Sequence, residues 1–203
     1  MGTRNLTMVI SDGTTRIAQY GQWDGYPSGQ GSTALNFLRE CDVDKFKEQL
    51  QRCRFIESSK RKQTELENFM KKIGAPNGWM TGDQAALYHK KYPFLTRDNG
   101  AEILNLIYNA KGSDNLWLHD STEFAADSLF CEWAYVIDLD KNTFEVYEGF
   151  NTQPLEEGQR FKDLKGEDNS DYSPVRMVKS YDIKNLPTVD VFISELEKQE
   201  EEA

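Results

Sequence analysis

The residues best suited to binding or chemistry gather in one stretch near the N-terminus, IAQYGQWDGYPSGQG, at residues 17–31. Its aromatic rings could stack on a planar ligand, while its amide and carboxylate groups could hydrogen-bond the polar edge of that ligand. Two of its glycines lie beside a predicted helix start, where accessible backbone N–H groups favour an anion. The candidate ligand-binding residues are Tyr20, Gln22, Trp23, Asp24, Tyr26, Gly29, Gln30 and Gly31.

The common nucleotide-binding motifs do not fit this stretch. Residues 29–34 have the form GxGxxA, but the dinucleotide fingerprint places its first glycine directly after a strand of a parallel βαβ unit. Here residues 21–28 intervene, and the preceding strand is predicted to pair in a hairpin. A Walker-type phosphate loop needs a lysine followed by Ser or Thr, which this stretch lacks. The alternative is a rigid structural turn, with its glycines at positive φ, stiffened by Pro27, and with its aromatic rings in the core.

Cys131 and His119 are the candidates for catalysis by a nucleophile and a base. Cys131 opens an apolar segment, where a thiol is more often a small buried hydrophobe, so the catalytic pair is the weaker alternative. The two histidines, His89 and His119, belong to no metal-binding motif. The sequence therefore predicts neither a metal nor a cofactor.

The composition is that of a folded acidic protein. The chain carries 34 acidic and 24 basic residues, which gives a formal net charge of −10. This charge disfavours nonspecific nucleic-acid binding, which needs a basic surface, but it is compatible with binding a basic protein surface. Three unpaired cysteines, no signal peptide and no long apolar run predict a cytoplasmic protein without a membrane span.

Two β-hairpins are expected, one in each half of the chain. Residues 6–10 and 15–20 are short β-type runs around an Asp-Gly pair, which is a strong hairpin signal. The second hairpin lies within residues 131–149, where CEWAYVIDLD and TFEVYEG flank a Lys-Asn turn. A last strand is expected over residues 175–183, after a polar surface loop at 156–173.

Helices are expected between these hairpins and at the C-terminus. Ser32 and Thr33 are suitable N-cap residues, and apolar residues three and four apart indicate helices within residues 42–73, at 83–91 and at 189–196. The acidic end, 195–203, is expected to fray. Together these elements predict an α+β fold in a single domain, 1–203. A largely antiparallel sheet is packed with helices, and a helical insertion separates the N-terminal and C-terminal hairpins.

Two blocks of the sequence resemble an uncharacterised protein family of tailed phages, bacteria and filamentous fungi. They are GTRNLTMVISDG…IAQYGQWDGYPSGQG at residues 2–31 and CEWAYVIDLDKNTFEVYEG at 131–149. The resemblance implies no particular activity, but a phage context implies an accessory or anti-defence role. The leading hypothesis is a binding protein whose YGQWDGYPSGQG loop holds a small polar or nucleotide-like ligand, or a segment of a host protein.

More loosely, the two-hairpin pattern is similar to N-terminal nucleophile hydrolases, which expose Cys, Ser or Thr as their first mature residue. Removal of Met1 leaves Gly2 first, with Thr3 one place further on. The resemblance implies an amidohydrolase as the alternative function. The hydrolase hypothesis takes Cys131 or Thr3 as nucleophile, with His119 or Asp24 assisting. A third hypothesis is an acidic interaction protein that blocks a basic effector surface.

Overall fold

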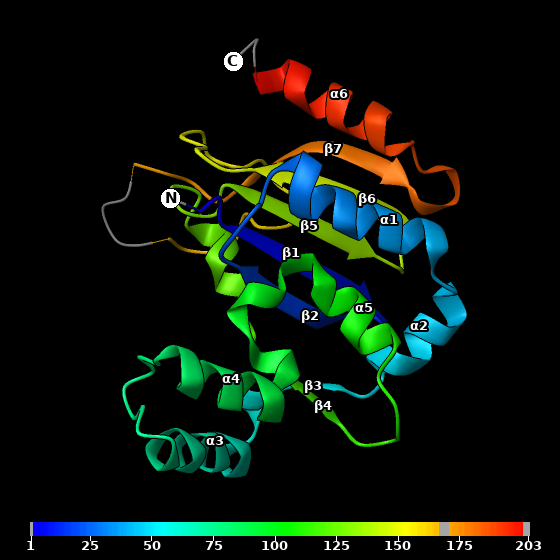
Figure 1. Ribbon diagram of the computed structural model, residues 1–203. Coiled ribbons are helices and arrows are strands. Elements are labelled where there is room, and N and C mark those ends of the chain that lie inside the picture. Colours follow the sequence, from blue (N-terminus) through cyan, green and yellow to red (C-terminus); the bar gives the residue numbers. More distant parts are fainter. Residues whose placement is uncertain (1, 167–170, 201–203) are drawn as a thin grey trace.

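A five-stranded sheet forms the centre of the molecule, with strands in the order β2-β1-β5-β6-β7 (Figure 1). The computed structural model describes residues 2–166 and 171–200. The parallel neighbours are β1 and β5, and the other neighbouring pairs are antiparallel. The predicted α+β fold and both predicted hairpins are therefore confirmed. The strands are β1 (Asn5–Ser11), β2 (Thr14–Gly21), β5 (Trp133–Asp138), β6 (Thr143–Glu148) and β7 (Arg176–Asp182).

The tips of the two hairpins lie together at one end of the sheet. Asp12, Gly13 and Asn142 have φ values of 56°, 66° and 58°, a left-handed conformation that these residue types adopt at low cost. The Asp140 carboxylate accepts hydrogen bonds from the N–H groups of Asp12 and Gly13 at 2.9 and 2.8 Å. This contact ties the N-terminal hairpin to the second hairpin.

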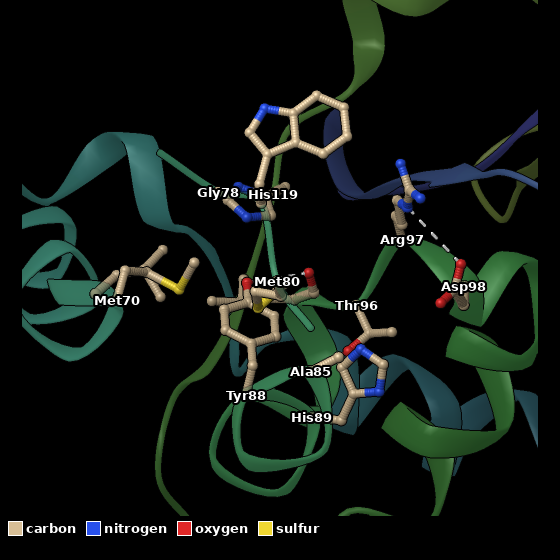
Figure 2. Close-up of a pocket in the computed structure, with 13 residues that line it drawn as sticks. Met70, Gly78, Met80, Ala85, Tyr88, His89, Thr96, Arg97, Asp98 and His119 are labelled. Carbon is tan, nitrogen blue, oxygen red and sulfur yellow. Dashed lines mark hydrogen bonds and ion pairs between the residues drawn. The ribbon is translucent and has the colours of Figure 1, made fainter. Parts of the chain in front are cut away.

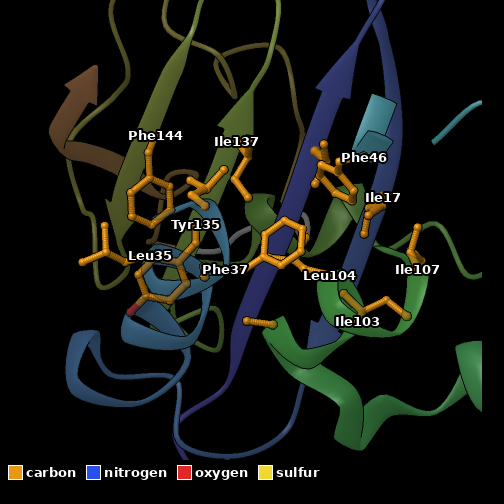
Figure 3. Close-up of a cluster of buried hydrophobic side chains, with 14 of the residues drawn as sticks. Ile17, Leu35, Phe37, Phe46, Ile103, Leu104, Ile107, Tyr135, Ile137 and Phe144 are labelled. Carbon is orange, nitrogen blue, oxygen red and sulfur yellow. The ribbon is translucent and has the colours of Figure 1, made fainter. Parts of the chain in front are cut away.

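Helices cover one face of the sheet. They are α1 (Ser32–Glu40), α2 (Val43–Leu50), α5 (Ile103–Tyr108) and α6 (Val189–Glu200). Their apolar side chains pack with those of the strands in the main core, where Figure 3 shows Leu35 of α1 beside Tyr135 of β5. The Phe37 ring of α1 contacts that of Phe46 of α2 edge-on, with ring centres 4.8 Å apart. Burial of such large side chains contributes about 1.5–3 kcal/mol each.

The other face of the sheet is covered by the turn η5 (Thr122–Ala126) and by the segment that leads to β7. Phe161 and Val175 from this segment pack against Leu6, Met8 and Tyr147. Of the polar loop predicted over residues 156–173, residues 156–166 and 171–173 form neither helix nor strand, and residues 167–170 lie outside the described residues. The loop is nevertheless anchored to the sheet through Phe161.

A second, smaller structural unit lies beside β2. Strands β3 (Cys53–Phe55) and β4 (Leu116–Leu118) pair in parallel, and helices α3 (Lys60–Lys72) and α4 (Gly82–Lys91) extend beyond them (Figure 1). Its core contains Ile56, Tyr88 and Leu95. The prediction of helical structure across residues 42–73 is wrong at 53–55, because Cys53 pairs with Leu116, which is distant in sequence.

Short helical turns complete the fold. The C-terminal end 195–203 was expected to fray. Residues 195–200 of it belong to helix α6, and residues 201–203 lie outside the described residues. Among the described helices, none combines the length and apolar character needed to cross a membrane. The remaining turns are η1 (Pro27–Gly31), η2 (Ile56–Ser58), η3 (Pro93–Leu95), η4 (Arg97–Glu102) and η6 (Ile183–Asn185).

Candidate functional site

The glycine-rich loop joins β2 to α1 through the π-helical turn η1, which continues directly into α1. The N–H groups of Gly29 and Gly31 both donate to the carbonyl oxygen of Tyr26, at 3.0 and 3.3 Å. The N–H of Gln30 donates to the carbonyl oxygen of Asp24 at 2.9 Å. The expectation that Gly29 and Gly31 leave N–H groups accessible for an anion is therefore wrong, because these donors close the turn itself.

The glycines of the loop allow close approach of backbone to the sheet. A Cβ atom on Gly31 would lie 2.8 Å from the ring of Tyr135, and the Tyr135 hydroxyl donates to the carbonyl oxygen of Gly25 at 2.7 Å. Positive φ in this loop falls on Asp24, at 53°, and on none of its glycines. The backbone of the loop is thus fixed by packing on β5. The positive φ that the structural-turn alternative assigns to the glycines is wrong, because Asp24 adopts it instead.

Of the side chains predicted to bind a ligand, some form hydrogen bonds within the protein and others are exposed. The side-chain amide of Gln30 accepts from the N–H of Ala101 at 2.6 Å and donates to the carbonyl oxygen of Trp23 at 3.3 Å. The Tyr20 hydroxyl donates to Oε1 of Gln22 at 2.7 Å. Asp24 is exposed, and Trp23 and Tyr26 are each 50% exposed, so the aromatic rings predicted for the core by the structural-turn alternative lie at the surface.

Exposed apolar side chains gather at the end of the sheet where this loop lies. Within the described residues, nine large hydrophobic side chains are exposed. Met177, which pairs with Tyr147 near the start of β7, is at this end of the sheet, and five more lie here in the loop and turns. Of these five, two come from the loop and three from turns that flank the start of β5 and the end of β6, on the left in Figure 1. We call this surface the loop-end face. It consists of Trp23, Tyr26, Leu129, Phe130 and Phe150.

N-terminal residues connect the part of the loop-end face that comes from the loop with the part that comes from the turns around β5 and β6. The Trp23 ring packs directly over Gly2, where a Cβ atom would collide with it. The guanidinium of Arg4 lies 4.3 Å from the ring centre of Phe130, a cation–π contact. The backbone N–H of Arg4 donates to Oε1 of Glu132 at 3.2 Å. The aromatic rings of these two parts are therefore bridged by residues 2–4.

Phe150 holds its exposed ring on a strained backbone. Its φ is 51°, a left-handed conformation that is rare for a bulky side chain and costs about 1–2 kcal/mol. The Phe150 N–H donates to the carbonyl oxygen of Ser128 at 2.7 Å, and the N–H of Asn151 donates to the Ser128 hydroxyl at 3.1 Å. The surrounding hydrogen bonds thus maintain a conformation that keeps an aromatic ring 56% exposed.

The candidate catalytic residues do not meet. Cys131 is fully buried, its Sγ lies 3.6 Å from the carbonyl oxygen of Trp133, and burial raises the pKa of its thiol. His119 instead places Nδ1 2.8 Å from Oε1 of Glu57. Thr3 is buried, and its carbonyl oxygen accepts from the N–H of Gly25 at 3.0 Å. In the part of the chain that the structure describes, no hydrogen bond joins any two of these three residues, and no His, Cys, Asp or Glu cluster could hold a metal.

A cavity that the sequence did not indicate lies beside β2, between helices α3 and α4 and residues 96–98. It is about 550 Å³ in volume, and both histidines, His89 and His119, line it (Figure 2). Its wall at residues 96–98 is attached to β2, because the side-chain amide of Gln19 donates to the carbonyl oxygen of Thr96 at 3.1 Å. Twelve of its thirteen lining residues fall within residues 66–98, and His119 comes from outside that stretch. The cavity is formed by the packing of α3, α4 and the turns that follow them, which no short motif indicates.

Comparisons with known proteins do not identify a function. No family model, no curated protein and no solved structure matches this chain. The resemblance to a phage, bacterial and fungal family therefore stays a prediction, and so do the roles that it implies.

Proposed function

We propose that this chain is a binding protein whose loop-end face docks a basic segment of a partner protein. The observation that carries the proposal is the concentration of exposed large apolar side chains at one end of the sheet. Contiguous exposed apolar surface in a folded protein is typical of an interaction site, and aromatic residues dominate the energetics of such sites.

Three carboxylates near the loop-end face favour a basic partner, and they outnumber the cation already on the face, the Arg4 guanidinium over Phe130. Asp24 is exposed beside Trp23, and Asp127 and Glu132 flank Leu129 and Phe130 in the chain. Lysine and arginine side chains can lie over aromatic rings and pair with the surrounding carboxylates. The net charge of −10 adds long-range attraction for a basic partner and repulsion for nucleic acid.

This proposal joins two hypotheses from the sequence, a partner segment at the loop and an acidic protein that covers a basic surface. An anti-defence role would require that the covered surface belongs to a host effector, and it stays a prediction from the resemblance. The buried Cys131 and the separation of His119 from it give the amidohydrolase alternative no support.

Binding of a defined peptide tests the proposal. The probe is a fluorescein-labelled peptide with repeats of Lys-Leu-Arg-Ala, and fluorescence anisotropy measures its affinity. A peptide with repeats of Glu-Leu-Asp-Ala and a double-stranded DNA oligomer are the comparison probes. We expect the basic peptide to bind most tightly and its affinity to fall as salt increases.

Substitutions locate the site. Trp23→Ala and Phe130→Ser are each expected to weaken binding of the basic peptide about tenfold. Val191→Ser is the matched control, because Val191 is also exposed but lies on α6. Retained melting temperatures show that the variants fold. Equal affinity of the Trp23→Ala protein and the unchanged protein, or tighter binding of the acidic peptide or the DNA, would overturn the proposal.

A further inference from the structure

We infer that the cavity beside β2 is a second site, which binds a small uncharged heteroaromatic molecule of the nucleobase or nucleoside class. The cavity lies between helices α3 and α4 and residues 96–98, and it is lined by none of the residues of the loop-end face. The inference therefore stands independently of the proposed partner-binding function.

The size and apolar walls of the cavity suit a flat molecule. Its volume of about 550 Å³ falls within the range typical of pockets for small molecules, about 300–1,000 Å³. Figure 2 shows Met70 of α3 on one side, with Met80 and Tyr88 at the centre. Thioether and aromatic side chains make favourable contacts with the faces of planar rings.

Thr96 provides an unused hydrogen-bonding group. Its side chain lines the cavity, yet the residue is only 6% exposed, and its hydroxyl has no hydrogen-bond partner within the described residues. Figure 2 shows it facing Ala85 and His89 of α4. A buried hydroxyl without a partner destabilises the fold, so its presence here favours a ligand that supplies the missing partner.

His119 presents a second polar group with a fixed orientation. Its Nδ1 is held 2.8 Å from Oε1 of Glu57, and Oε2 of Glu57 accepts from the N–H of Asp120 at 3.2 Å. When Nδ1–H donates to Glu57, Nε2 of the neutral ring carries the lone pair, so it can accept a hydrogen bond from a ligand. A hydroxyl and an imidazole acceptor on one cavity match the mixed donors and acceptors along the edge of a nucleobase.

The charges of the cavity favour an uncharged ligand. Among the residues that line it, Arg97 and Asp98 are the only Arg, Lys, Asp or Glu side chains, and they lie 3.9 Å apart. Because these two charges oppose each other, the cavity holds no unpaired charge for a phosphate or an ammonium group. Trp79 lines the cavity while 89% exposed, and could stack over a bound ring.

Isothermal titration of the full chain with adenosine, guanosine, cytidine and uridine, and with their 5′-monophosphates, tests the inference. We expect at least one nucleoside to bind and to raise the melting temperature, and its monophosphate to bind more weakly. Failure of every nucleoside to bind would overturn the inference, and tighter binding of the monophosphate would overturn the assignment to an uncharged ligand.

Thr96→Val separates a ligand-binding role of the hydroxyl from a structural one. We expect this variant to melt at a higher temperature without ligand, because an unpartnered buried hydroxyl is removed, and to bind the nucleoside about tenfold more weakly. Thr7→Val is the matched control, since the Thr7 hydroxyl is also buried and unpartnered but lies on β1 outside the cavity lining. Equal affinities of the two variants would overturn the role of Thr96.

Discussion

At the scale of single residues, Phe150 combines two unfavourable properties, an exposed aromatic ring and a left-handed backbone. An exposed aromatic ring alone is ordinary at a protein surface, but a left-handed backbone is rare for a bulky residue, and their coincidence on the loop-end face is consistent with a binding role. Asp24 has a similar φ, at 53°, within the loop itself. Both left-handed residues at this end of the sheet therefore lie on or beside the loop-end face.

The strain at Phe150 predicts an inverted order of stability between two substitutions. Phe150→Gly and Phe150→Ala remove the same ring, but only the alanine keeps a Cβ atom in the left-handed conformation. We expect the free energy of unfolding of the glycine variant to exceed that of the alanine variant by about 1 kcal/mol. At positions with negative φ the order is normally the reverse, because glycine loses more conformational freedom on folding. Urea denaturation measures the difference. A less stable glycine variant would show that the strain is not present in solution.

At the scale of elements, Arg160 fastens the loop that leads to β7 onto the hairpin of β5 and β6. Its Nη2 lies 2.7 Å from Oδ2 of Asp138 and 2.8 Å from Oε1 of Glu145. Both carboxylates are almost fully buried. Burial raises the pKa of each carboxyl group, but hydrogen bonds and charge from Arg160 outweigh it and hold both pKa values below their usual range.

The depressed pKa values of Asp138 and Glu145 determine how this contact depends on pH. Its contribution to stability is complete above the pKa values of the unfolded chain, about 3.9 for Asp and 4.3 for Glu, and is lost as pH falls through the lower values of the folded state. Arg160→Met leaves two buried carboxylates without a cation, and we expect it to cost about 3 kcal/mol at neutral pH. Because the carboxylates become protonated in acid, the cost shrinks near pH 3.

Chemical denaturation at both pH values measures this change. Arg176→Met is the matched control, because Arg176 forms an ion pair with Glu148 at 3.0 Å while half-exposed, and such pairs contribute less than about 1 kcal/mol. A cost for Arg160→Met that is the same in acid as at neutral pH would show that the buried ion pairs do not stabilise the loop.

Local patterns predicted the elements whose partners are close in sequence. The Asp12-Gly13 turn identified the first hairpin, and the spacing of apolar residues identified the helices. Strands β3 and β4 were missed because each has three residues and pairs with a segment about sixty positions away. Arg160 was missed because one charged residue in a polar loop has no local signal of burial.

The residue types of the glycine-rich loop indicate that it is unusual, but its hydrogen-bond partners and its neighbours in space depend on the fold. Gly29 and Gly31 resemble an anion site only until their N–H groups are traced to Tyr26. Leu129, Phe130 and Phe150 were not predicted to join Trp23, because only the parallel pairing of β1 with β5 brings their turns to the same end of the sheet. Neighbours across a sheet are set by register, which residue types alone do not specify.

At the scale of the whole molecule, the main sheet and the α3–α4 unit differ in how firmly they are packed. The side chains of β5 are all buried, whereas α3 has no fully buried residue over its 13 positions. The α3–α4 unit forms one wall of the cavity, so a ligand there would join the loosely packed helices to residues 96–98 beside β2.

This difference predicts the pattern of amide hydrogen exchange. Exchange in α3 should be faster than in β5, because segments with few buried contacts open with a lower free energy than the core. A nucleoside that binds the cavity should slow exchange in both α3 and α4 and leave β6 and β7 unchanged. Exchange measured by mass spectrometry, with and without the nucleoside, checks both parts, and Thr96→Val should reduce the slowing at equal nucleoside concentration. Protection of α3 equal to that of β5 without ligand would contradict the first part, and slowing confined to the loop-end face would contradict the second.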